Sequence, residues 1–202
     1  MANPVKLAKK KSRLHETLDV VIWAVVMAFL ARSFLIQAFR IPSGSMEDTL
    51  LVGDFLFVNK FLYGAEIPFT DIRLPGLREP RPGDIIVFKY PSEKDDYIKR
   101  CVAVGGQTIE IRDGVVYVDS LMVEESYIKR SRGPASRNFP PKKVPEGQIF
   151  MMGDNRNNSR DSRILGAVDW RKSVKGKAIF IYWSWDGEKN FPRFDRIGDL
   201  IH

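Results

Sequence analysis

The sequence predicts a mainly β domain that follows an N-terminal transmembrane helix. Beyond residue 40, short runs of β-branched and aromatic residues alternate with intervals rich in proline and glycine, which is typical of strands joined by turns. No amphipathic helix of convincing length interrupts this alternation. Ahead of it, an apolar stretch follows a basic tail, the order that is expected at a membrane-inserted N-terminus.

The first 39 residues divide into a basic tail and an apolar segment. The tail, residues 1–16, has five Lys or Arg and one Glu, a net charge of +4. Residues 20–31 (VVIWAVVMAFLA) are uncharged but too short to cross a bilayer, which needs about 20 residues. Residues 17–39 taken as one helix reach that length. A removable signal peptide with a cleavage site at residues 31–33 fits the same pattern equally well.

Either interpretation predicts the same orientation, because the excess of Lys and Arg keeps the tail cytoplasmic and sends residues 40–202 across the membrane.

The β domain is predicted from six runs. Residues 108–112 and 115–119 flank Asp113-Gly114, a strong signal for a two-residue hairpin. We expect a smaller inserted β subdomain in residues 106–147, in which residues 129–147 form an extended exposed loop. The other strands are expected at residues 54–60, 84–90, 148–152 and 177–185.

Composition excludes several kinds of chemistry. Outside the tail only +3 of the net charge of +7 remains, without a basic patch interleaved with aromatics, so nucleic acid is not an expected partner. Cys101 is the single cysteine and is expected to be buried. The two histidines, His15 and His202, lie in the tail and at the last residue. A Ser-His-Asp triad, a Cys-His pair and a histidine metal site are therefore not expected.

Three segments could form a site without imidazole. Residues 41–46 (IPSGSM) place two serines around a glycine, which is either an ordinary turn or a nucleophile beside an oxyanion donor. Lys99, in residues 97–102 (YIKRCV), either points to water or is buried and acts as a base, because burial lowers a lysine pKa. Residues 153–163 (GDNRNNSRDSR) are a dense polar loop without a phosphate cradle or a metal-ligand pattern. We expect no metal and no cofactor.

These segments, in this order, resemble the type I signal peptidases, also called leader peptidases. The resemblance covers residues 41–54, 83–91, 97–100, 153–163 and 175–185, and so nearly the whole chain after the apolar segment. It implies a twisted antiparallel β-sheet catalytic domain and a serine endopeptidase with a Ser-Lys dyad. Its partners would be the signal peptides of exported preproteins and the lipid bilayer.

The resemblance also implies roles for individual residues. Ser45 would be the nucleophile, Lys99 the general base, and Ser43 an oxyanion donor beside the backbone N–H of Ser45. Ser159 would hydrogen-bond to the Lys99 amine. Asp161 and Arg163 would form a supporting ion pair. The residues expected to line shallow pockets for the small side chains before the cleavage point are Phe39, Ile41, Leu50, Tyr97 and Ile98.

The family keeps its membrane helix, which favours an anchor over a removable signal peptide. The chain would then be a single-pass protein of the bacterial cytoplasmic (inner) membrane, with its catalytic domain on the outer face. Departures from the family pattern are Asp48 in place of proline, Asn157 in place of aspartate, and Asp169-Trp170 where a proline is more usual.

Two other hypotheses remain at this point. One is a self-cleaving Ser-Lys regulator, although the chain has no DNA-reading module. The other is a tethered β-rich binding module whose serines are turn residues. A second Tyr-Ile-Lys-Arg stretch, residues 127–130, contains Lys129. We reject Lys129 as the base because no Gly-Asp strand precedes it and a polar run follows it, so it is expected to be exposed.

Overall fold

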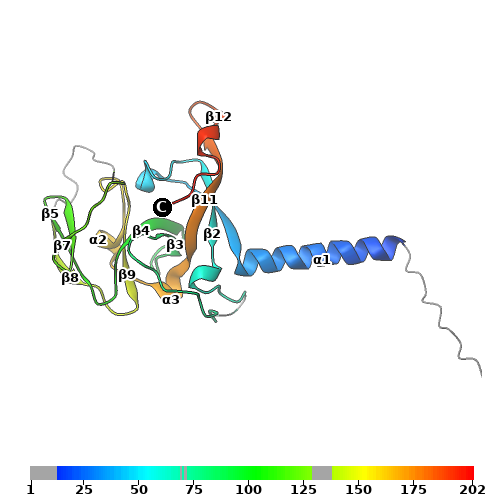
Figure 1. The fold of residues 1–202 in the computed structure, drawn as a ribbon, viewed down its shortest axis with the longest axis horizontal. Coiled ribbons are helices and arrows are strands. Elements are labelled where there is room, and N and C mark those ends of the chain that lie inside the picture. The colour runs from blue at the N-terminus through cyan, green and yellow to red at the C-terminus, as the bar shows by residue number, and fades with distance from the viewer. Residues whose placement is uncertain (1–12, 69, 71, 129–137) are drawn as a thin grey trace, which may run out of the picture.

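The computed structural model describes residues 13–68, 70, 72–128 and 138–202. Helix α1 (Arg13–Phe34) projects from one side of a β domain (Figure 1). Its side chains are almost all exposed, and its length and composition are sufficient to cross a membrane. The basic tail lies outside the described residues except for its last four, which belong to α1.

The predicted span of the apolar helix, residues 17–39, is wrong at both ends. The helix starts earlier, at Arg13, and ends at Phe34, after which β1 (Ile36–Arg40) begins. Residues 36–40 pair antiparallel with residues 55–59. Strand pairing therefore satisfies backbone groups of residues 36–40, and this tertiary contact decides between helix and strand where local hydrophobicity does not.

The confirmed mainly β fold is built on an eight-stranded antiparallel sheet. Four register shifts interrupt its ladders, and such bulges increase twist, which curls the sheet. In spatial order the strands are β1, β2 (Asp54–Asn59), β11 (Val174–Asp186), β3 (Ile85–Lys89), β4 (Asp96–Val104), β9 (Gln148–Met152) and β10 (Val168–Asp169), while β12 (Phe191–Pro192) pairs with β11.

A second sheet lies at the end of the domain away from α1 (Figure 1). Its order is β7 (Leu121–Met122), β6 (Val115–Val118), β5 (Thr108–Arg112) and β8 (Phe139–Lys143). These strands fall within residues 106–147, where an inserted subdomain is predicted. The hairpin at Asp113-Gly114 is confirmed, since both residues have positive φ, 49° and 83°, as a type I′ turn requires.

The predicted loop at residues 129–147 is wrong in its second half. Residues 139–143 form β8, which pairs with β5 at the edge of the second sheet. Pro140 and Pro141 suggested a loop, but an edge strand has one side without ladder partners and so tolerates proline. Residues 129–137 of that prediction lie outside the described residues.

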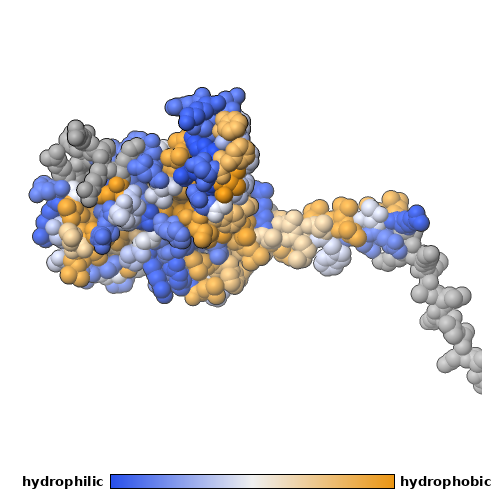
Figure 2. All heavy atoms as spheres, turned by 45° about the horizontal axis from the view of Figure 1, so that its top comes forward, coloured by the Kyte–Doolittle hydropathy of each residue, from blue (hydrophilic) through white to orange (hydrophobic). Residues whose placement is uncertain are grey.

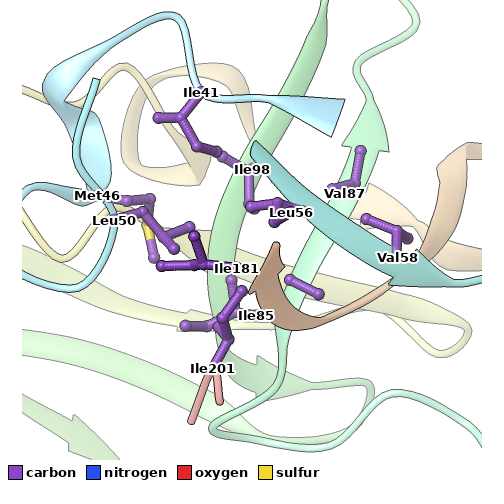
Figure 3. Close-up of a cluster of buried hydrophobic side chains, with 11 residues drawn as sticks. Ile41, Met46, Leu50, Leu56, Val58, Ile85, Val87, Ile98, Ile181 and Ile201 are labelled. Atoms are coloured by element: carbon purple, nitrogen blue, oxygen red, sulfur yellow. The ribbon is translucent and has the colours of Figure 1, made fainter. Parts of the chain in front are cut away.

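Hydrophobic residues cover both faces of the main sheet. In β3, Ile85 and Val87 point into one cluster, and Ile86 and Phe88 into another. Figure 3 shows the first cluster, where side chains of β2, β3, β4 and β11 meet those that follow β1. A third cluster joins β4 and β9 to the second sheet. The segment that carries Ser45 is thereby packed onto the core.

Beyond residue 40, the described helices are all short. Their brevity agrees with the prediction that no long amphipathic helix is present. They are η1 (Gly44–Met46), η2 (Phe61–Tyr63), α2 (Ser162–Leu165), α3 (Trp170–Ser173) and η3 (Phe194–Arg196).

Candidate active site

Ser45 lies in a single 3₁₀ turn, η1, that is anchored on both sides. Ile41 and Met46, 2% and 0% exposed, bury their side chains in the core, and the backbone N–H of Ile41 donates to the carbonyl of Asp54 at 2.8 Å. Between these anchors the Ser45 side chain is held just below the surface, 7% exposed. The Ser-Gly-Ser stretch is therefore a turn whose second serine points inward.

Lys99 reaches Ser45 from β4. Its ammonium donates hydrogen bonds to the Ser45 Oγ at 2.6 Å and to the carbonyl of Ile98 at 2.9 Å. The pairing of β9 with β4 ends at Arg100 opposite Met152, so η1 rather than a strand lies against β4 at the next residue, Lys99. The lysine is 3% exposed, and the expectation of a solvent-facing lysine is excluded.

Burial changes the acid–base chemistry of this lysine. Desolvation lowers the pKa of Lys99 to about 8, while the carboxylates of Asp161 and Asp154 oppose the shift. An amine with this pKa is substantially neutral slightly above neutral pH, and a neutral amine at 2.6 Å can accept the serine proton. The pair can thus activate a hydroxyl without imidazole.

Ser43 lies on the solvent side of the same turn. Its Oγ is 3.5 Å from the Ser45 Oγ, and the residue is exposed. A substrate carbonyl carbon attacked by Ser45 would place its oxygen within the range of a donor in this position.

The polar loop, residues 153–163, holds the serine turn in place. The Asn155 N–H donates to the Ser45 carbonyl at 3.1 Å, and the Asn155 Nδ2 donates to the Gly44 carbonyl at 3.0 Å. Gly153 lies directly against the Ser45 carbonyl. A Cβ there would lie 2.5 Å from the Ser45 carbonyl oxygen and 2.3 Å from the Ser159 Oγ. Only glycine allows this approach.

A buried ion pair formed by the residue that follows Lys99 was not predicted from the sequence. Arg100 and Asp154, 3% and 0% exposed, form a bidentate pair with distances of 2.9 and 2.7 Å, and the Thr49 hydroxyl donates to Asp154 at 2.6 Å. Both residues lie within predicted site segments, and this position was the available signal. Their pairing across 54 residues could not be read locally.

Asp161 and Arg163 form the predicted ion pair, which is confirmed. The Arg163 Nε donates to the Asp161 Oδ1 at 2.8 Å, and both side chains are buried. The pKa of Asp161 is lowered: burial raises it, but the charge and hydrogen bonds of Arg163 and the Gly153 N–H outweigh this effect. A charged Asp161 is thereby kept near the amine of Lys99.

The predicted hydrogen bond from Ser159 to the Lys99 amine is wrong in this structure. The Ser159 hydroxyl donates to the Asp161 carboxylate instead, at 2.7 Å. The carboxylate accepts the hydrogen bond of the hydroxyl, because a bond to an ionised acceptor is stronger than one to a neutral acceptor, and the Lys99 ammonium donates to Ser45 and to the Ile98 carbonyl. Ser159 packs beside Gly153, close to the dyad.

The predicted pocket residues divide by exposure. Ile41, Leu50 and Ile98 are 2%, 0% and 8% exposed and belong to the core cluster, so they offer almost no surface to a substrate. Phe39 and Tyr97 are partly exposed. The ring centroid of Tyr97 is 5.4 Å from the Lys99 Nζ. These two side chains therefore remain as surface candidates for substrate contact.

Several remaining predictions concern single residues. Cys101 is buried as expected, and burial raises the pKa of its thiol. Asp48 has a φ of 81°, which proline cannot adopt. Lys129 lies outside the described residues. Within the described part of the chain, no group of three His, Cys, Asp or Glu could hold a metal ion.

Comparison with known proteins decides the family. Residues 14–183 match the family model described as signal peptidase, peptidase S26. The chain belongs to the signal peptidase family. It is 37% identical to a signal peptidase I of Pseudomonas aeruginosa, over 87% of this chain and 75% of that protein. It is 34% identical to a signal peptidase I of Bacillus licheniformis, over 90% and 95% of the two chains.

The chain is also similar to a crystal structure of a signal peptidase I from Enterococcus faecalis, with 29% sequence identity and a TM-score of 0.44. The match covers 50% of this chain and 98% of the chain in that structure. As a member of the signal peptidase family, this chain is a serine endopeptidase, a hydrolase. The family predicted from the three segments is thus confirmed.

Proposed function

We propose that this signal peptidase removes signal peptides from exported preproteins with a Ser-Lys dyad while anchored in a membrane. The observation that carries the proposal is the 2.6 Å contact between the Lys99 Nζ and the Ser45 Oγ in a nearly water-free setting. Of the two histidines, His15 lies in α1, and His202 is an exposed residue whose backbone carbonyl accepts from Arg100 at 3.0 Å. In the described part of the chain, the side chains within hydrogen-bond distance of the Ser45 Oγ are those of Lys99 and Ser43, not of a histidine.

In the proposed reaction, neutral Lys99 takes the proton of the Ser45 hydroxyl while the serine oxygen attacks the carbonyl carbon of the last signal-peptide residue. The resulting oxyanion accepts hydrogen bonds from the Ser43 hydroxyl and the Ser45 N–H. The C–N bond then breaks, and the leaving amine takes the proton from the Lys99 ammonium. Water, deprotonated by Lys99, hydrolyses the acyl-enzyme and restores the serine.

The membrane part of the proposal is supported by α1. Its 22 residues span about 33 Å at 1.5 Å per residue, close to the roughly 30 Å of a bilayer core. The basic tail, residues 1–16, favours a cytoplasmic N-terminus. The catalytic domain would then stand on the outer face of the bacterial cytoplasmic membrane, where exported preproteins emerge.

The enzyme is proposed to prefer signal peptides that have small residues just before the cleaved bond. Phe39 and Tyr97 are the partly exposed apolar side chains among the predicted pocket residues, and shallow apolar surfaces favour small side chains over charged ones.

A cleavage assay tests the proposal. The full chain in detergent is mixed with a preprotein that carries a small-x-small site. Wild type should cut after this site, while Ser45→Ala and Lys99→Ala should not. Lys129→Ala is the matched control, because it removes the lysine of the second Tyr-Ile-Lys-Arg stretch, and it should cut at the wild-type rate. Cleavage by Lys99→Ala at the wild-type rate would refute the dyad.

A further inference from the structure

A cavity of about 170 Å³ lies where α1 joins the β domain. The backbone N–H of Lys60 donates to the carbonyl of Leu35 at 2.9 Å, which ties one wall of the cavity to the residue that follows α1. The cavity is open to the surface and takes its walls from β1, the start of β11 and the segment after β2. The lining residues are Gln37, Lys60, Glu66, Arg73, Val174 and Lys175.

Positive charge predominates around this cavity. Arg73 pairs with Glu66 at 2.6 Å, and Lys175 pairs with Asp96 at 2.7 Å. Within each of these two pairs, the positive and the negative charge neutralise each other. Lys60 is the third cation of the lining, and Arg32 in the last turn of α1 adds a fourth positive charge to its surroundings.

Lys60 differs from the other two lining cations because its ammonium makes no hydrogen bond or ion pair with any described residue. Burial lowers its pKa, and the charges of Lys175, Arg73 and Arg32 lower it further against the opposing effect of Glu66. A half-buried amine with three cations and one carboxylate around it carries an electrostatic cost that a bound anion would lower.

Apolar side chains border the cavity on the side of the helix. Leu35, Ile36 and Phe61 are 48%, 43% and 46% exposed, and Figure 2 shows hydrophobic surface where α1 meets the domain. If α1 spans the bilayer, as the proposed function holds, the end of the helix places the cavity at the level of the lipid headgroups. If the phosphate group of a phospholipid occupied the cavity, the acyl chains of that lipid would lie against these apolar side chains.

We propose that this cavity binds the phosphate group of an anionic phospholipid, with Lys60 as its principal partner. A free phosphate ion offers the same anionic oxygens, but it would leave the apolar border uncovered. The site thus sets the height and orientation of the catalytic domain at the membrane surface. The inference rests on the proposed membrane anchoring and is independent of the proposed dyad.

The experiment measures binding to the full chain in neutral detergent by native mass spectrometry. The probes are dioctanoyl phosphatidylglycerol, dioctanoyl phosphatidylcholine and inorganic phosphate, each titrated separately. We expect phosphatidylglycerol to bind more tightly than either other probe. Lys60→Gln should weaken it about tenfold, the effect of losing one charge-assisted hydrogen bond. Lys89→Gln, which alters an exposed lysine of β3, is the matched control and should change the affinity by less than about twofold.

Equal binding of phosphatidylglycerol by wild type and Lys60→Gln would overturn the assignment, as would a similar loss in Lys89→Gln. If inorganic phosphate or phosphatidylcholine bound as tightly as phosphatidylglycerol, the lipid identity would be wrong. Preprotein cleavage and resistance to alkaline extraction from membranes are measured on the same variants. If the wild-type protein does not cleave the preprotein, or is extracted from membranes by alkali, the proposed function is refuted. If the wild type passes both tests and only the lipid titration fails, only this inference is refuted.

Discussion

The active site and the cavity at the base of α1 each contain a lysine whose pKa is lowered chiefly by burial. They differ in the charges around them. Lys99 lies near the carboxylates of Asp161 and Asp154, which oppose the shift, and it has Ser45 as a partner. Lys60 lies near Glu66, which opposes the shift, and near three cations that add to it, and its ammonium makes no hydrogen bond or ion pair with a described residue. The first environment suits a base that must exchange a proton, and the second suits an anion site.

The largest expected effect separates the two lysines by activity. Lys99→Met should lower kcat/KM by about 10³-fold or more, because it removes the amine that lies 2.6 Å from the Ser45 Oγ and is proposed to take its proton. Lys60→Met should leave cleavage in detergent unchanged. Steady-state rates on one preprotein check both variants. If the two substitutions have similar effects on the cleavage rate, the assignment of different roles to Lys99 and Lys60 is wrong.

Within the active site, the two flanking serines should differ. Ser43→Ala should lower kcat by roughly 10²–10³-fold through loss of an oxyanion donor. Ser159→Ala should cost less than about tenfold, because its hydroxyl bonds to Asp161 rather than to the amine. A loss in Ser159→Ala as large as that in Ser43→Ala would mean that Ser159 contacts Lys99 when substrate is bound.

The pH profile should report Lys99 alone. Because the ammonium form cannot accept a proton, kcat/KM should approach a tenfold fall per unit well below the pKa near 8, or about 50-fold in all between pH 8 and pH 6. Lys60→Gln should keep the same inflection. Rates measured across pH 5.5–9.5 decide this, and an inflection that moves with Lys60 would contradict the assignment.

The smallest expected effect is on stability. The folded-state pKa of Lys99 lies below its unfolded value, so the unfolded chain binds more protons, and stability rises with pH between about 8 and 10.5. Below pH 8 the buried amine is destabilising. Lys99→Met should therefore raise the free energy of unfolding by about 2 kcal/mol at pH 7, after allowance for two lost hydrogen bonds.

Chemical denaturation of the full chain in detergent at several pH values measures this difference. The advantage of Lys99→Met should shrink as pH rises toward 10. Lys60→Met should show a smaller change of the same sign, since Lys60 is only half-buried. A stabilisation of Lys99→Met that did not depend on pH would show that packing rather than charge is its cause.

Local sequence predicted the strands well where turn chemistry was clear. Residues 148–152 and the hairpin at Asp113-Gly114 follow directly from β-branched runs bounded by residues that permit positive φ. Prediction from local sequence failed where strand pairing overrode the local preference of the residues. Residues 36–39 are as apolar as the helix before them yet form β1, and the two prolines of β8 hid an edge strand.

The candidate site was predictable in its members but not in its contacts. Ser45 and Lys99 were found through family motifs. The Arg100–Asp154 pair was missed, and the partner of Ser159 was predicted wrongly. Hydrogen-bond partners depend on which acceptor is nearest after folding, and residues 45, 99 and 154 are brought together only by the packing of separate strands.

By itself the sequence determined the class of the protein: a β-rich catalytic domain behind an apolar helix, in a chain without a usable imidazole. Tertiary structure alone decided that the amine of Lys99 is buried against a hydroxyl, and that Lys60 stands near three other cations and one carboxylate beside the end of α1. The physical reason is that burial and the local field are sums over residues distant in the chain, and no short stretch of sequence contains those sums.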